Sequence, residues 1–256
     1  MGTKKKEVAK KQKQNTGVTG ITEGANLDDW GQAPQVSSRD TIIPRVMLMQ
    51  LMSKQVADDQ AAYGELRDSL TMEKLGSATE PLEIIPFHFA PVWIEKQYNK
   101  DEDEYKYLRT VAIDSSNDNL PFEDEEHGIS RIRTLQFFVI LPSVLSAEGN
   151  ALPKIVSFRS TSLRNGRKLS TQMYMTNRAA GLPPAGMVMK LTVKKTENDK
   201  GKFAVMDVEP SRKATDIELA EAFKWFKAVK SDVSIKTDDR DLDADAKENT
   251  EDTGKF

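Results

Sequence analysis

Strand-forming segments fill the middle of this chain, and a single helical segment interrupts them. Residues 82–95 are rich in β-branched and aromatic side chains, and their two prolines suit an edge or bulged strand better than a helix. Residues 105–113, 129–141 and 154–158 predict three further strands, of which 129–141 is the most continuous apolar run. This order restricts the chain to folds that are built mainly from β-strands.

The hydrophobic period then changes from that of a strand to that of a helix. The hydroxyl groups of Ser160–Ser162 can cap a helix, and Leu169, Met173 and Ala180 recur on one helical face. The Gly181–Pro184 segment that follows is typical of a helix end. We therefore expect one helix from about residue 160 to about residue 180.

A hairpin and a final helix complete the predicted elements. Apolar residues alternate along 187–195, and a second apolar stretch, 203–208, returns after a turn, so residues 187–208 predict a β-hairpin. Thr215 followed three residues later by Glu218 is typical of a capping box, and helical periodicity continues to Lys230.

These elements amount to five or six antiparallel strands with a helix before the last hairpin and a C-terminal helix. We expect an OB-like barrel over residues 41–232, and an α+β sandwich fits the same order. Residues 1–40 hold too few large apolar side chains to offset the entropy of ordering, so they predict a disordered basic arm. Residues 233–256 predict a disordered acidic tail.

Charge is segregated into blocks, although the formal net charge is only −3. Residues 1–13 sum to +5, residues 101–127 to −8 and residues 237–256 to −5. Residues 149–196 contain nine Lys and Arg and no Asp or Glu, and so sum to +9. Blocks of one sign are typical of tails, solvated faces or binding surfaces.

The acid-free stretch predicts a nucleic-acid-binding surface. Cations displace the counterions that are condensed on phosphates, whereas a carboxylate in the groove would repel the strand. Tyrosine rings nearby can stack on bases. The alternative is an ordinary solvated surface of Lys and Arg. The candidate DNA-binding residues are Lys154, Arg159, Arg164, Arg167, Lys168, Arg178, Lys190, Lys194, Lys195, Tyr105, Tyr107 and Tyr174.

The acidic tail is the second functional signal. It can occupy the basic surface in competition with nucleic acid, and it can present its terminal aromatic residue to a partner protein; the alternative is a tail that serves only solubility. The candidate tail residues are Asp238, Asp239, Asp241, Asp243, Asp245 and Phe256.

Composition argues against an enzyme and against a bound cofactor. The chain has no Cys, and its two His leave little for a metal site or a nucleophile–base pair. The acidic loops at 101–104 and 123–126 leave open a magnesium site. No apolar run reaches the length of a membrane span, and the basic N-terminus lacks the apolar stretch of a secretory signal, so we expect a cytoplasmic protein.

The order of elements, the basic stretch and the acidic tail resemble the single-stranded DNA-binding proteins of tailed bacteriophages. The segments Ile43–Val46, Phe158–Leu163 and Lys200–Phe203 contribute to this resemblance, although Gly254–Lys255 separates the acids from the terminal Phe256. The resemblance implies an OB fold, sequence-tolerant coating of DNA in the host cytoplasm, and contacts of the tail with replication proteins.

The sequence therefore predicts a non-enzymatic protein that binds and protects single-stranded DNA during phage replication or recombination. Two alternatives remain open. Opposed charge blocks also suit a structural or assembly protein of a virion, and the acidic loops suit a magnesium-dependent enzyme that processes DNA. The oligomeric state and the choice between DNA and RNA are open at this point.

Overall fold

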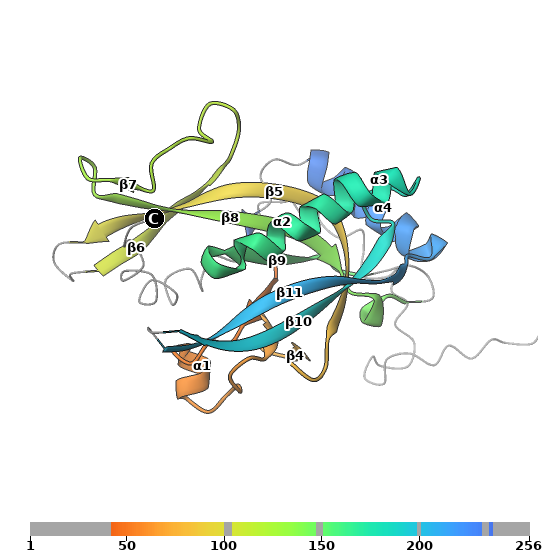
Figure 1. The fold of residues 1–256 in the computed structure, drawn as a ribbon, viewed down its shortest axis with the longest axis horizontal. Helices are drawn as coiled ribbons and strands as arrows, with labels where there is room; N and C mark the ends of the chain where they lie inside the picture. Colours follow the sequence, from red (N-terminus) through yellow and green to blue (C-terminus); the bar gives the residue numbers. More distant parts are fainter. Residues whose placement is uncertain (1–41, 100–103, 147–150, 199–200, 232–235, 238–256) are drawn as a thin grey trace, which may run out of the picture. The chain divides into compact units, whose positions relative to one another are not determined.

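The computed structural model describes five stretches of the chain, all within one compact unit (Figure 1). These are residues 42–99, 104–146, 151–198, 201–231 and 236–237. The predicted basic arm and the acidic residues of the predicted tail lie outside the described residues. The first and last described strands, β1 (Ile42–Ile43) and β12 (Lys236–Thr237), pair in parallel.

The main sheet is organised around one long strand, β5 (Leu82–Asn99). The start of β5 pairs with β10 (Met187–Asn198), and its end pairs with β6 (Glu104–Ala112). Along its other edge β5 pairs almost throughout with β8 (Ile129–Ile140), and the two strands run through the middle of Figure 1. Pro86 and Pro91 both lie within β5. The expected bulge is found at the first of them, because the pairing of β5 with β8 shifts between Pro86 and His88.

The expected closed barrel is not found. Apart from the two-stranded sheet of β1 and β12, the described strands form one open, mixed sheet. Its strand pairs are antiparallel except for one parallel pair, β2 (Arg45–Leu48) with β9 (Lys154–Arg159). A further short strand, β7 (Glu123–Asp124), pairs with β8. The order across the sheet is β11 (Gly201–Lys213), β10, β5, β8, β9, β2, β3 (Leu66–Asp68) and β4 (Lys74–Gly76).

Within the described part of the chain, side chains and not another strand bind the outer edge of β11. The amide side chain of Gln50 donates to the Ala204 carbonyl and accepts from the Ala204 N–H, both at 2.9 Å. Asn165 donates to the Met206 carbonyl at 2.7 Å. These amides satisfy edge groups that would otherwise be free to pair with another chain.

The mainly β fold and both predicted helices are confirmed. The helical segment 160–179 begins with a 3-10 turn (Ser160–Ser162) and continues as α2 (Leu163–Thr171), a π-helical turn (Gln172–Thr176) and α3 (Asn177–Ala179). The C-terminal helix is α4 (Asp216–Ser231). Shorter helical turns are α1 (Lys54–Ala57) and η2 (Pro142–Val144).

Helices α2 and α4 cover opposite faces of the sheet. Successive side chains of a strand point to opposite faces, so alternate residues of β8 enter different cores. Phe137 and Val139 pack in one core with Leu169 of α2, whereas Phe138 packs in the other core with Ala222 of α4. The first core also receives the inner face of the β10–β11 hairpin. The helical segment is thus held between the sheet and solvent.

Candidate nucleic-acid interface

The helical segment 160–179 separates buried from basic side chains. Gly166, Leu169 and Met173 are buried against the sheet. Asn177 is buried too, and its side-chain amide donates to the Pro183 and Pro184 carbonyls. The spacing of these four buried residues, by three and four, defines the inner face of a helix. The outward face is exposed and carries four cations from the candidate set. These are Arg164, Arg167, Lys168 and Arg178.

Gly166 lets this helix lie unusually close to the sheet. A Cβ atom at this position would lie 2.8 Å from Phe158 Cβ and 3.0 Å from Leu135 Cδ1. Phe158 itself is fully buried and edge-to-face with Phe137, so its ring belongs to the core. The helix that carries the basic face is therefore packed closely on the buried side chains of the sheet.

Two lysines of the candidate set meet at one carboxylate. Lys194 of β10 and Lys168 of α2 place their Nζ atoms 2.5 Å and 3.4 Å from the two oxygens of Asp207 on β11. Asp207 Oδ1 also accepts the Val208 N–H at 2.8 Å. Burial raises the pKa of Asp207, but the hydrogen bonds from Lys194 and Val208 and the charge of Lys168 outweigh burial and hold that pKa below its usual value.

Lys195 and Lys190 have different surroundings. Lys195 is exposed, and its ammonium group lies 4.8 Å from the centre of the Tyr63 ring in a cation–π contact. Lys190 is half-buried, and the sheet register places it opposite Glu83 on β5 and Glu209 on β11. Acids on both neighbouring strands therefore weaken the local positive potential at Lys190.

The candidate cations on β9 lie in the sheet and not on the helix. Lys154 Nζ contacts Asp68 Oδ2, and the two side chains are only 14% and 4% exposed. Asp68 also accepts the N–H groups of Leu70 and Thr71, so it organises the β3–β4 turn. Arg159 is half-buried at the end of β9.

Tyr174 is the candidate aromatic residue that shares the helical segment with the arginines. It lies in the π-helical turn, its side chain is 40% exposed, and its ring centre is 6.4 Å from that of Phe89. Partial burial raises the pKa of its hydroxyl group, while a hydrogen bond with the Phe89 backbone lowers it. π-helical turns are frequent at functional sites.

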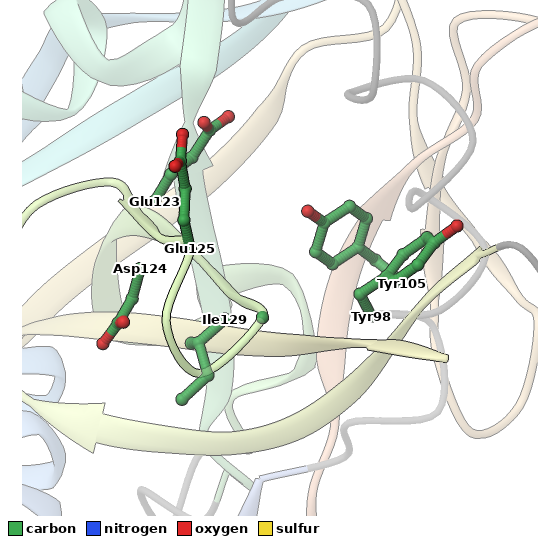
Figure 2. Close-up of a pocket in the computed structure, with 7 residues that line it drawn as sticks. Tyr98, Tyr105, Glu123, Asp124, Glu125 and Ile129 are labelled. Atoms are coloured by element: carbon green, nitrogen blue, oxygen red, sulfur yellow. The ribbon is translucent and has the colours of Figure 1, made fainter. Parts of the chain in front are cut away.

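Tyr105 lies in acidic surroundings. It lines an open pocket with Tyr98 on one side, and Glu123 and Glu125 lie across the opening (Figure 2). The rings of Tyr98 and Tyr105 are 5.3 Å apart. Among the described residues that line this pocket, the charged ones are all acids.

Tyr107 is half-buried and packs against the apolar cluster of Val92 and Ile94. Its hydroxyl group is 3.2 Å from that of Thr110. The structure thus brings Arg164, Arg167, Lys168, Arg178 and Tyr174 together and places Tyr105 and Tyr107 on the β5–β6 hairpin.

Neither a metal-binding cluster nor a membrane-spanning helix is present in the part of the chain that the structure describes. No three His, Asp or Glu side chains there are grouped so that they could hold a metal ion. No helix there is long and apolar enough to cross a membrane.

A protein-family model, the Pam3 phage gp34-like protein family, matches residues 13–236, which is most of the chain. The chain belongs to this family. Comparisons with curated proteins and with solved structures gave no significant match. The family description agrees with the phage part of the resemblance in the sequence, and it names no activity.

The sequence does not reveal two acids that pair with candidate cations. The stretch 149–196 has no acid along the chain, yet Asp68 and Asp207 reach it from other strands. The alternation along 203–208 places Asp207 outward, opposite Thr192, so the hairpin register was the signal that could have revealed it. No local signal connects Asp68 with Lys154.

Proposed function

We propose that this phage protein binds single-stranded DNA along the outward face of the helical segment 160–179 and the adjoining part of β10. The observation that carries this proposal is the exposed row of Arg164, Arg167 and Arg178. Within the described residues none of these three guanidinium groups takes part in an ion pair, so each is available to a phosphate.

The size and chemistry of this face suit a single strand. From Arg164 to Arg178 the helical rise spans about 20 Å. Phosphate contacts along such a row supply affinity without reading base sequence. Tyr174 lies within the row and can stack on a base, which an unpaired strand exposes and a duplex hides.

This proposal includes the biological role inferred from the sequence. A protein that coats and protects single strands acts in replication or recombination and needs no catalytic step. The acidic tail, which ends in Phe256 and lies outside the described residues, would compete with DNA for the basic face and contact partner proteins. Its net charge of −5 over residues 237–256 supports the competition.

The test is a fluorescence anisotropy titration with labelled oligo-dT. The triple variant R164A/R167A/R178A should weaken binding by more than a hundredfold at about 50 mM salt. The slope of log affinity against log salt concentration should also become shallower by about two. The matched control, K54A/K213A/K227A, removes the same charge from exposed positions elsewhere and should change affinity by less than about fivefold, since long-range charge alone is screened.

Two results would overturn the proposal. One is an absence of wild-type binding to oligo-dT at low salt; the other is an equal loss in the triple variant and in its control. If the DNA-free protein instead forms large ordered assemblies in size-exclusion chromatography with light scattering, a virion structural role becomes the better explanation.

A further inference from the structure

The ammonium groups of Lys168 and Lys194 together form an anion-binding site, and the carboxylate of Asp207 occupies it. One ammonium group comes from a helix and the other from a strand, and they bind different oxygens of Asp207 at 3.4 Å and 2.5 Å. Two cations that converge on one small oxyanion from separate elements are also the arrangement that binds a phosphate.

We propose that Asp207 is a displaceable internal anion, and that a strand phosphate replaces its carboxylate between Lys168 and Lys194 when DNA binds. This inference rests on the proposed function, and it adds a phosphate site together with the residue that regulates access to it. Asp207 would then set how much of the positive charge on this face is available.

Exposure makes the displacement feasible. The Lys168 and Lys194 side chains are 54% and 69% exposed. Asp207 is 20% exposed, but both lysines reach water, and ion pairs made by such lysines contribute little to stability, so the lysines exchange readily for another anion. The pair of Lys154 with Asp68 differs, because both side chains are buried and a separated charge there would lack solvation.

Asp207 also keeps a partner when the lysines leave it. Its Oδ1 accepts the Val208 N–H at 2.8 Å, and this backbone group belongs to β11 and does not depend on either lysine. The site can therefore open without leaving a bare carboxylate.

A built-in competitor changes what the surface binds. A free phosphate ion must displace Asp207 without the help of any other contact. A DNA strand that also contacts Arg164 and Arg167 brings its phosphate to the site at a high local concentration. We therefore expect the surface to discriminate against free phosphate and in favour of a continuous strand.

The test compares D207N with E209Q in the oligo-dT titration. Both variants remove one acid from β11. Glu209 is exposed and forms no ion pair with Lys168 or Lys194, so its charge acts on this face only at a distance, and E209Q measures the effect of net charge alone. D207N keeps the Oδ1 acceptor and should bind oligo-dT about eightfold more tightly than wild type at about 50 mM salt, the effect of roughly one added phosphate contact. E209Q should gain less than about twofold.

The triple variant D207N/K168Q/K194Q, compared with K168Q/K194Q, separates this inference from the proposed function. In the K168Q/K194Q background D207N should give no gain, because the freed lysines produce it. If wild type binds oligo-dT but D207N gains no more than E209Q, or if the gain survives loss of both lysines, the inference is wrong and the proposed function stands. If wild type does not bind, both are wrong.

Discussion

Arg131 and Glu95 lie directly opposite each other on β8 and β5, and Arg131 Nε donates to Glu95 Oε1 at 2.8 Å. Arg109 donates to the other carboxylate oxygen at 2.7 Å, so Glu95 joins three strands of the sheet. The Glu95 and Arg131 side chains are only 3% and 8% exposed. Burial raises the pKa of Glu95, but the hydrogen bonds from Arg131 and Arg109 outweigh burial and keep its pKa below the usual value.

We predict that E95Q lowers the free energy of unfolding by about 2–3 kcal/mol, because removal of one partner leaves a buried guanidinium group under-compensated. The loss should fall short of a fully orphaned charge, since Arg131 also contacts Asp124 and the Pro121 carbonyl. Urea denaturation measures this change. E73Q removes an exposed acid and should change stability by less than about 0.5 kcal/mol; an equal effect of both variants would contradict the prediction.

Glu218 predicts a specific acid sensitivity. The hydrogen bonds from the Arg212 guanidinium group, together with the one from the Thr215 N–H, lower the Glu218 pKa to about 2 against the competing effect of burial. A depressed native pKa stabilises the fold above the unfolded value of 4.5, and this stabilisation is lost as pH falls from about 4.5 to about 2. Arg212 is 41% exposed, so solvent screening limits the contribution to about 2 kcal/mol.

Urea denaturation of wild type and E218Q at neutral pH and at about pH 2.5 tests this linkage. The variant should be less stable than wild type at neutral pH. The difference should shrink in acid, because Glu218 is then protonated in the unfolded chain and begins to be protonated in the native protein. A difference that stays constant across the pH range would rule out the Arg212 pairing as its cause.

The close approach of the helical segment to the sheet predicts that G166A destabilises the protein by about 1–3 kcal/mol, since overpacking at Phe158 and Leu135 forces the helix outward. Intrinsic helix propensity favours Ala by about 0.5–1 kcal/mol, so the sign of the measured change isolates the packing term. Thermal and urea unfolding of G166A should be compared with T171A, an exposed position of the same helix. A more stable G166A would contradict the packing.

Because Lys154 pairs with Asp68 inside the sheet, we expect loss of this pair to change the stability of the protein but not its affinity for DNA. K154M should lower stability by about 3 kcal/mol, because Asp68 is left as an uncompensated charge. Oligo-dT affinity of the folded fraction should stay within about twofold of wild type. R164A should show the reverse: weaker binding with unchanged urea denaturation. A large binding loss in folded K154M would instead place Lys154 among the DNA contacts.

Gln50 predicts a role in keeping the edge of β11 closed to other chains. Q50A should cost about 1–2 kcal/mol, since the Ala204 N–H and carbonyl both lose a partner. The exposed edge should also promote self-association, which light scattering detects. Q97A, at an exposed position of β5, is the control. A monodisperse Q50A of wild-type stability would refute this role.

Local patterns in the sequence were sufficient for most elements. Alternation predicted β10 from Met187, and the capping box at Thr215 is confirmed, with Glu218 Oε2 accepting the Thr215 N–H at 2.7 Å and Thr215 Oγ1 accepting the Glu218 N–H at 3.4 Å. These signals arise within a few residues of chain, where propensity and side-chain capping act.

Non-local pairing was not accessible in the same way. The parallel pairing of Arg45 with Ile155 and the contact of Asp68 with Lys154 join segments far apart in sequence, and neither strand carries a pattern that specifies its neighbour. The barrel expectation failed for this reason. The sequence predicts the exposed cations of the candidate site on α2 but not Asp207, because the order of charges along the chain does not show which strands become neighbours.

Strand β5 has a further consequence for how the protein unfolds. The hairpin with β6 and the core beneath α2 share this one continuous strand, and β8 accompanies it almost along its full length. Neither part can detach without breaking the same ladder of backbone hydrogen bonds. We therefore expect native-state hydrogen exchange to show one cooperative unit, in which amides at both ends of β5 open with the same free energy.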